Sequence, residues 1–386
     1  MNGPLSNVKV LDFGLAVAGP YASMLLAEMG AEVIKIEPPE GDEARGAAPV
    51  INGISAIFAS SNKNKKSLGI DLKNPSSRNV VEKLFKWTNV VLENFRPGVR
   101  ERLGISPEDA FKVNRDLVYV SIKGFRPDSK YGDLPAYDMI VQSMSGIMLS
   151  MGTQQDPPIR VPFALFDIFT GNLAALEILT GLISSKRPYY AEAYLFDTGI
   201  YSMNYLIQSF LLTGSEPKRL GGIHFSYAPH QPYMDSDGKW FTVAIVSDRQ
   251  WLKLCDALGL EDLKNDKELL TNIGRVANRD RINARLVKLF SSKSRDYWID
   301  ILKKAGIPVA PVYSIKELFS DDYSNNLIYN CENLKLLSFP GKINGERPRP
   351  IRPPPIRQGS DSDEVLKELG FNDSEISRLK KEGVIK

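Results

Sequence analysis

Asp167 is the residue of this sequence best placed to act as a nucleophile. It follows the apolar run at 161–166 and precedes a long helical pattern that begins IFTGNLAALEILTGL. Apolar surroundings raise the pKa of a carboxyl group, whereas the unpaired amides and the positive end of a helix favour its ionised form. A carboxylate in this setting can stay an anion with little water around it. Aspartate is also a favoured helix N-cap, and the local sequence alone favours capping over catalysis.

The segment 93–104, ENFRPGVRERLG, is the second group of residues that could do chemistry. It directly follows a predicted strand, where the carboxyl end of a parallel sheet forms a crevice for ligands. Asn94 could hydrogen-bond a ring edge or a sugar, and Phe95 could stack on a base. Forked donors that match phosphate geometry come from Arg96, Arg100 and Arg102. The segment predicts a nucleotide-phosphate site, and the alternative is a turn that carries solvated arginines.

Other common chemistries are poorly supported. The run GLAVAG at 14–19 has the glycine spacing of a phosphate loop, but Pro20 and Tyr21 stand where Lys and Ser or Thr are needed, and no GxGxxG occurs. His224 and His230 are the only histidines, and they lie in a loop-like stretch without zinc-type spacing. No GxSxG nucleophile elbow is present. We therefore expect no metal site, and covalent chemistry, if any, should use a carboxylate.

Bulk composition sets further limits. Lys plus Arg number 49 against 46 for Asp plus Glu, and a net charge of +3 is too small to indicate a nucleic-acid or membrane partner. Cys255 and Cys331 are the only cysteines, which fits a reducing compartment, so we expect a cytoplasmic protein. The N-terminus shows no export signal, and no apolar run reaches about 18 residues. The length of 386 residues predicts two domains.

Strands and helices that could position these residues alternate along the first half of the chain. Strands are predicted at 8–14, 32–38, 67–72, 90–95 and 117–125, with helices between them at 19–31, 76–89 and 107–114. This order predicts a parallel sheet covered by helices. A further helix is predicted to open at Asp167 and to end near 186–188, followed by a strand at 191–197 and a largely buried helix at 201–212.

The character of the sequence changes near residue 215, where we expect a domain boundary. DSDG at 235–238 predicts a hairpin turn, and helices are predicted at 248–258, 279–290 and 295–305. A proline-rich linker at 348–359 then precedes two short amphipathic helices, which end at Gly370 and Gly383.

A series of ordered blocks runs through the chain. They read AGPYASMLLAEMGAEVIKIEPPEGD, NKNKKSLGIDLK, ENFRPG, VSIKGF, YDMIVQSMSGIM and the Asp167 segment, then DRQWLKLCDALG, GRVANRD, AGIPVAPV and DEVLKELGF. Over essentially its whole length the sequence therefore resembles the CaiB/BaiF family, the class III CoA-transferases. The resemblance implies an α/β fold with a Rossmann-like parallel-sheet large domain built from both chain ends, a smaller α+β domain, and an interlocked homodimer. The implied boundaries are 1–200 for the N-terminal part of the large domain, 201–224 for a linker, 225–325 for the small domain, and 326–386 for a return linker and C-terminal helices.

The resemblance also implies roles for individual residues. Asp167 becomes the nucleophile that accepts the acyl group, through a mixed anhydride and then an aspartyl-CoA thioester. Coenzyme A is expected near Val17, Ala18, Lys73, Asn94, Phe95, Arg96 and Arg102, with Tyr137 and Asp138 beside the reacting centre. The formyl-CoA transferase branch of the family differs at several of these places, since it has Gln, Arg, Lys and Glu where this chain has Val17, Pro38, Pro135 and Asp138.

Two other functions stay open at this point. The α-methylacyl-CoA racemases share the fold and the aspartate, but they place a histidine where this chain has Tyr137, and the reference pKa of tyrosine, about 10, makes it a poor base at neutral pH. The second alternative is a non-catalytic acyl-CoA-binding protein. The favoured function is CoA transfer between an acyl-CoA and a carboxylic acid, with coenzyme A as part of the substrate, no metal, and no nucleic-acid or membrane partner.

Overall fold

A six-stranded parallel sheet forms the centre of the larger part of the protein. The computed structural model describes residues 3–349 and 351–386. All neighbouring strands of the sheet pair in parallel, in the order β5-β2-β1-β6-β7-β8. The strands are β1 Lys9–Asp12, β2 Glu32–Glu37, β5 Lys65–Gly69, β6 Val90–Glu93, β7 Val118–Lys123 and β8 Tyr189–Tyr194. The predicted parallel sheet is confirmed.

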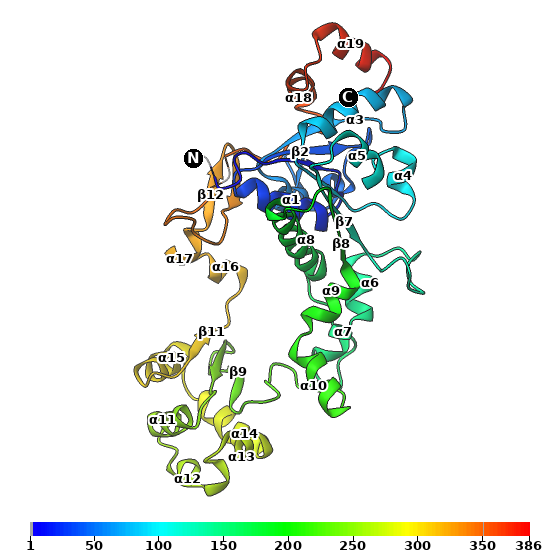
Figure 1. Ribbon diagram of the computed structural model, residues 1–386. Coiled ribbons are helices and arrows are strands. Elements are labelled where there is room, and N and C mark those ends of the chain that lie inside the picture. The colour runs from blue at the N-terminus through cyan, green and yellow to red at the C-terminus, as the bar shows by residue number, and fades with distance from the viewer. Residues whose placement is uncertain (1–2, 350) are drawn as a thin grey trace. The chain divides into compact units, whose positions relative to one another are not determined.

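Helices cover both faces of this sheet, and alternating strand residues supply a core on each face (Figure 1). In β1, for example, Leu11 packs in one core and Val10 in the other, because successive side chains of a strand point to opposite faces. The helices that contribute to the first core are α3 Arg78–Trp87, α5 Pro107–Val113, α18 Ser362–Glu368 and α19 Asp373–Lys381. Those that contribute to the second core are α1 Ala18–Glu28, α6 Asp138–Met144, α8 Leu165–Ile183 and α9 Leu195–Ser202.

The close packing of α1 against α8 is what brings Asp167 to the sheet edge. A Cβ atom at Gly171 would lie 2.8 Å from the backbone oxygen of Ala18, so only glycine permits the helices to come this near. By length and composition α8 could cross a membrane. One face of it packs in the second core, where Ala174 and Ile178 are fully buried, whereas Leu176 and Ile183 are exposed. Asp167 lies one turn before Gly171 and is therefore held beside the start of α1.

Contacts divide the chain into two compact units, of which the first contains residues 1–147, 160–212 and 325–386. Its shorter elements are α2 Ala56–Asn62, α4 Val99–Leu103, α6 Asp138–Met144, α9 Leu195–Ser202 and α10 Tyr205–Thr213, with the hairpins β3 Val50–Ile51 with β4 Ile54–Ser55 and β12 Ile328–Cys331 with β13 Leu334–Leu337.

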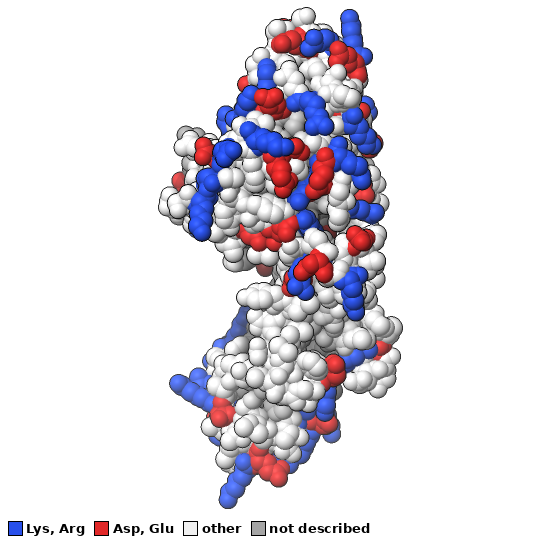
Figure 2. All heavy atoms as spheres, turned by 45° about the vertical axis from the view of Figure 1, so that its right-hand side comes forward, with Lys and Arg blue, Asp and Glu red and all other residues white. Residues whose placement is uncertain are grey.

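The predicted buried helix at 201–212 is wrong in two respects. The chain forms two helices, α9 and α10, separated by Asn204 at a φ of +44°, and no side chain of α10 is buried. Tyr201, Leu211 and Leu212 are 85%, 69% and 77% exposed. Figure 2 shows that charged side chains of both signs cover the part of the molecule that carries the sheet, whereas few lie over the region of α6, α9 and α10. An apolar sequence pattern cannot distinguish a buried helix from one whose apolar side chains are exposed.

The second unit contains residues 148–159 and 213–324. Its antiparallel sheet, in the order β11-β10-β9, joins β9 His230–Met234, β10 Trp240–Ala244 and β11 Val309–Pro311. The helices around it include α11 Asp248–Leu258, α13 Asn272–Ala277, α14 Arg279–Phe290 and α15 Arg295–Lys304, and Trp251 and Phe290 are fully buried in the core. The predicted hairpin and the helices at 248–258, 279–290 and 295–305 are confirmed.

Candidate active site

Asp167 lies at the wall of a cavity of about 340 Å³ in the first unit. The carboxylate is on the third residue of α8, and its side chain is half-buried. The other residues that line the cavity come from the carboxyl ends of the strands and the segments that follow them, and include Leu15, Ala16, Val17, Ala18, Asn94, Phe95, Arg96, Lys123, Gly124 and Tyr137. The cavity therefore lies where a parallel sheet is expected to bind a ligand.

Asp138, not Asp167, caps the start of α8. The helix begins at Leu165, two residues before the predicted start, and its N-cap position is Ala164, which has no polar side chain. One carboxylate oxygen of Asp138 accepts a hydrogen bond from the Phe166 amide at 2.7 Å, and the other accepts one from Gln142 Nε2 at 2.6 Å. The capping role proposed for Asp167 from the local sequence is thus wrong.

This arrangement leaves the Asp167 carboxylate without a partner. Within the described part of the chain it accepts no hydrogen bond and forms no ion pair. Burial raises its pKa to about 7, and the nearby negative charge of Asp138 adds to the effect. At neutral pH a large fraction of the molecules therefore carries an anion that is poorly solvated and free to react.

Residues 14–18, which we call the wall segment, supply one side of the cavity through the four residues 15–18. Asn94 holds this segment: its Oδ1 accepts a hydrogen bond from the Leu15 amide at 2.9 Å, and its Nδ2 donates to the Leu15 oxygen at 2.8 Å. The side chain predicted to bind a ring edge or a sugar is thus engaged with backbone. Its contribution to the site is the shape of the wall segment.

The three arginines of segment 93–104 do not act as one group. Arg100 turns inward, with Nη1 3.0 Å from Glu93 Oε1 and 3.1 Å from the Tyr190 hydroxyl. It is therefore an internal ion-pair partner and not a phosphate donor. Arg96 and Arg102 are exposed and form no ion pair with any residue that the structure describes, so their donors face solvent.

Lys73 and Arg102 line a second cavity, of about 540 Å³. Leu15, Phe95 and Val99 line both cavities, so the two adjoin. Of the residues predicted for the site, Val17, Ala18, Asn94, Phe95, Arg96 and Tyr137 lie with Asp167 in the first cavity, Lys73 and Arg102 lie in the second, and Asp138 lines neither. An elongated ligand with an anionic end and a reactive end could extend through both.

Residues 123–125 also line the Asp167 cavity, although no role was predicted for them. They follow β7 at its carboxyl end, as segment 93–104 follows β6, and the two strands are neighbours in the sheet. Segment 93–104 was selected because ligands bind at the carboxyl ends of parallel strands, and the same reason applies to residues 123–125. Among residues 3–349 and 351–386, no group of three or more His, Cys, Asp or Glu side chains could hold a metal ion.

Comparison with known proteins agrees with this geometry. Residues 5–359 match the family described as CoA-transferase family III. The chain is 32% identical over 350 residues to acetyl-CoA:oxalate CoA-transferase of Acetobacter aceti, covering 89% of this chain and 90% of the relative. It is 31% identical over 395 residues to succinyl-CoA:glutarate CoA-transferase of Mus musculus, covering 99% and 90%.

Solved structures give the same result. A CaiB/BaiF family protein from Brucella suis matches with a TM-score of 0.84 and 30% identity, covering 96% of this chain and 100% of that chain. The protein Rv3272 from Mycobacterium tuberculosis matches with a TM-score of 0.83 and 26% identity, covering 94% and 98%. The chain belongs to CoA-transferase family III, and the protein is accordingly an enzyme of the class III CoA-transferases.

Proposed function

We propose that this enzyme moves coenzyme A from an acyl-CoA donor to a carboxylic acid, with the Asp167 carboxylate as the covalent carrier. The observation that carries the proposal is the unpartnered, half-buried Asp167 carboxylate in a cavity next to exposed cationic side chains. The relatives support the reaction class, since their names give oxalate, glutarate and D-citramalate as acids and acetyl-CoA or succinyl-CoA as thioesters.

The first half of the reaction transfers the acyl group from sulfur to oxygen. A carboxylate oxygen of Asp167 attacks the thioester carbonyl, the carbon–sulfur bond breaks, and coenzyme A leaves as a thiolate. The product is a mixed anhydride between Asp167 and the donor acyl group. The thiolate then attacks the aspartyl carbonyl, which releases the donor acid as a carboxylate and leaves an aspartyl-CoA thioester.

The second half reverses these steps with the acceptor. The acceptor carboxylate attacks the aspartyl-CoA carbonyl and forms a new mixed anhydride, with coenzyme A again leaving as a thiolate. Attack of the thiolate on the acceptor carbonyl gives the new acyl-CoA and restores the Asp167 carboxylate. Each step exchanges one activated acyl bond for another, so one difficult transfer becomes several easier ones.

The two adjoining cavities suit the two ends of coenzyme A. In this proposal Lys73 and Arg102 bind phosphate groups in the second cavity, Arg96 assists from the rim, and Phe95 lies where both cavities meet. Val17, Ala18 and Tyr137 surround the reacting thioester. Asp138 contributes indirectly, because it fixes the start of the helix that carries Asp167.

The exposed helices favour a homodimer. Leu176, Ile183 and Tyr201 are 59%, 87% and 85% exposed, and a groove of about 720 Å³ between α8 and α9 is lined largely by apolar atoms. Monomers rarely expose so much contiguous apolar surface. We propose that a second copy of the chain covers it, in the interlocked arrangement that the family resemblance implies, and that the enzyme acts in the cytoplasm. A molar mass of one chain in solution at micromolar concentration would contradict the dimer.

The proposal is tested by trapping the acyl-enzyme. The protein is incubated with acyl-CoA and hydroxylamine, which converts an aspartyl anhydride or thioester into a stable hydroxamate, and peptides are examined by mass spectrometry. We expect modification at Asp167 alone. A racemase or a non-catalytic binder gives none, and a racemase would instead exchange the α-proton of the acyl group with solvent.

A further inference from the structure

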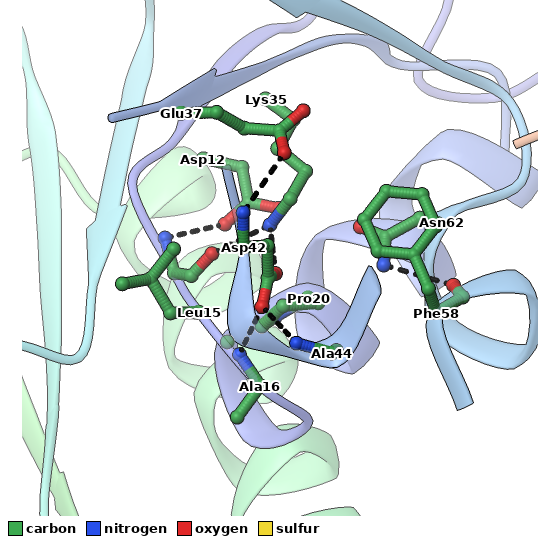
Figure 3. Close-up of polar contacts among 12 residues, drawn as sticks. Asp12, Leu15, Ala16, Pro20, Lys35, Glu37, Asp42, Ala44, Phe58 and Asn62 are labelled. Carbon is green, nitrogen blue, oxygen red and sulfur yellow. Dashed lines mark hydrogen bonds and ion pairs between the residues drawn. The ribbon is translucent and has the colours of Figure 1, made fainter. Parts of the chain in front are cut away.

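A cluster of buried charged residues contacts the wall segment from the side of the sheet (Figure 3). Asp12 at the end of β1, Lys35 in β2 and Lys65 in β5 are all fully buried, and Asp42 is 2% exposed. The register of the sheet places Asp12 opposite Lys35. None of these side chains lines the Asp167 cavity, so the reaction described above does not use them directly.

Lys35 and Asp42 bind the wall segment through two backbone groups. Lys35 Nζ lies 2.7 Å from Asp42 Oδ2 and donates to the Gly14 oxygen at 2.7 Å. The other oxygen of Asp42 accepts hydrogen bonds from the Ala16 amide at 3.0 Å and the Ala44 amide at 2.9 Å. The ion pair thus connects a carbonyl and an amide that are two residues apart in the wall segment.

Asp12 and Lys65 bind the same segment and the start of α1. Asp12 Oδ1 accepts a hydrogen bond from the Gly14 amide at 2.8 Å. Asp12 Oδ2 lies 2.9 Å from Lys65 Nζ, which also donates to the Pro20 oxygen at 2.8 Å. With the two bonds from Asn94 to Leu15, side chains engage the amides of three successive wall residues, at 14, 15 and 16.

These bonds hold an unfavourable backbone conformation. Ala16 has a φ of +63°, a left-handed conformation that costs a residue with a Cβ atom about 1–2 kcal/mol. The turn is also tight, since a Cβ atom at Gly14 would lie 2.9 Å from the Cα of Gly19. The bonds from fixed side-chain partners to the polar groups of the wall segment offset this cost.

Stability alone does not explain so many buried charges. Desolvating a carboxylate and an ammonium group costs several kcal/mol, and well-packed apolar residues in their place are often as stable or more so. What apolar residues cannot supply is a set of directed bonds to the wall segment. That segment provides Leu15, Ala16, Val17 and Ala18 to the cavity that contains Asp167.

We propose that Lys35 and Asp42 are positioning residues for CoA transfer: their buried ion pair fixes the wall segment at the distance from Asp167 that the reacting thioester requires. This inference rests on the proposed role of Asp167. It assigns to the pair no contact with substrate and no proton transfer.

The test compares Lys35→Met and Asp42→Asn with wild type at a temperature where circular dichroism shows all of them folded. We expect Lys35→Met to lower kcat by about 10²-fold, because a displacement of about 1 Å at a reacting centre has that effect. The Kd for free coenzyme A should change less than kcat, since Lys73 and Arg102, the proposed phosphate ligands, lie outside the wall segment. Hydrogen exchange should become faster at the amides of residues 14–16.

Lys63→Met is the matched control. Lys63 is also a buried lysine of the first unit, 2.6 Å from Glu28, but it makes no contact with the wall segment. The Lys63→Met variant should lose stability as Lys35→Met does. It should keep the wild-type kcat and the wild-type rate of hydrogen exchange at the amides of residues 14–16. If Lys35→Met does not fold, Asp42→Asn decides. It keeps an acceptor for the Ala16 amide, but it removes the charge and replaces the oxygen that faces Lys35 with an NH2 donor, so the ion pair is lost. We expect about a tenfold lower kcat.

Wild-type kcat in a folded Lys35→Met or Asp42→Asn variant would overturn the inference, as would an equal loss of kcat in Lys63→Met. A parallel Asp167→Asn sample separates this failure from that of the proposed function. If Asp167→Asn transfers coenzyme A at the wild-type rate, the nucleophile is misassigned. If Asp167→Asn is inactive and Lys35→Met is fully active, only the positioning role is wrong.

Discussion

Asp12 and Asp167 are two aspartates of the same unit in opposite environments. Asp12 is fully buried and is bonded to Lys65, Ser23 and the Gly14 amide. Burial by itself would raise the pKa of Asp12, but Lys65 and Lys35 outweigh it and lower that pKa below its usual value. Asp167 is less buried, yet burial without a partner raises its pKa to about 7.

If Asp167 is the nucleophile, as proposed, the difference means that partners, not burial, separate a structural carboxylate from a reactive one. Fully bonded, Asp12 holds backbone in place. Without bonds of its own, Asp167 keeps both oxygens available for attack, and the fold bears the cost of an unpaired charge. The same substitution at the two sites should therefore have opposite consequences.

The largest expected effect is the loss of activity in Asp167→Asn. The amide is a poor nucleophile, so kcat should fall by about 10³-fold or more, the scale seen when a principal catalytic group is removed. Steady-state transfer between an acyl-CoA and an acid measures it, with mass spectrometry to exclude deamidation back to aspartate. Transfer at the wild-type rate would contradict the distinction between the two aspartates, because Asp167 would then have no more part in the reaction than Asp12.

Asp12→Asn should produce the largest loss of stability. The change leaves Lys65 buried without its counter-ion, and breaking a buried ion pair in this way costs about 3–5 kcal/mol. Denaturant unfolding of the two variants side by side checks this. A loss of less than about 1 kcal/mol, the value typical of exposed pairs, would mean that the charge cluster is open to solvent.

The rate should depend on pH through Asp167. In the proposed mechanism the ionised form of Asp167 is the nucleophile. Because the pKa of Asp167 is about 7, kcat/KM should be constant above that value and fall about tenfold per pH unit well below it. A pH profile with a stable acyl-CoA measures the pKa. A rate that stays constant down to about pH 5 would show that Asp167 titrates like an ordinary surface aspartate.

Asp167→Asn should make the protein more stable at pH 8. Because the folded-state pKa of Asp167 is raised, the native state binds more protons than the unfolded state between pH 3.8 and about 7, and wild-type stability falls as pH rises through that range. The neutral amide avoids this cost, which we place at about 1–2 kcal/mol after allowance for residual solvent screening. The difference between variant and wild type should disappear below about pH 4; a difference independent of pH would have another origin.

Arg102→Ala should have the smallest effect. Loss of a charge-assisted bond to phosphate should weaken coenzyme A binding about tenfold. Binding of a truncated thioester without phosphate groups, measured in the same way, serves as the control and should not change. Equal weakening for both ligands would place Arg102 outside the phosphate site.

The sequence was sufficient for features that depend on neighbouring residues. The parallel sheet and the helices of the second unit follow from local pattern, whereas the role of Asp167 as nucleophile comes from the family resemblance and stays a prediction. Features that depend on distant residues were missed. The cap of α8 comes from Asp138, 28 residues before Phe166, and Asn94 binds Leu15 across 79 residues. Lys35 offered a signal, because it interrupts an apolar strand of a sheet covered on both faces, where a lysine must find an internal partner.

Transfer of a labelled oxygen tests the central claim most directly. The enzyme is given an acyl-CoA donor and an acceptor acid for a single turnover. Both carboxylate oxygens of the acceptor acid are heavy oxygen. When the acceptor anhydride is cleaved by the thiolate, one acceptor oxygen remains on the aspartate, so the peptide that contains Asp167 should gain one heavy oxygen atom. A fully active enzyme whose Asp167 peptide stays unlabelled would contradict the account.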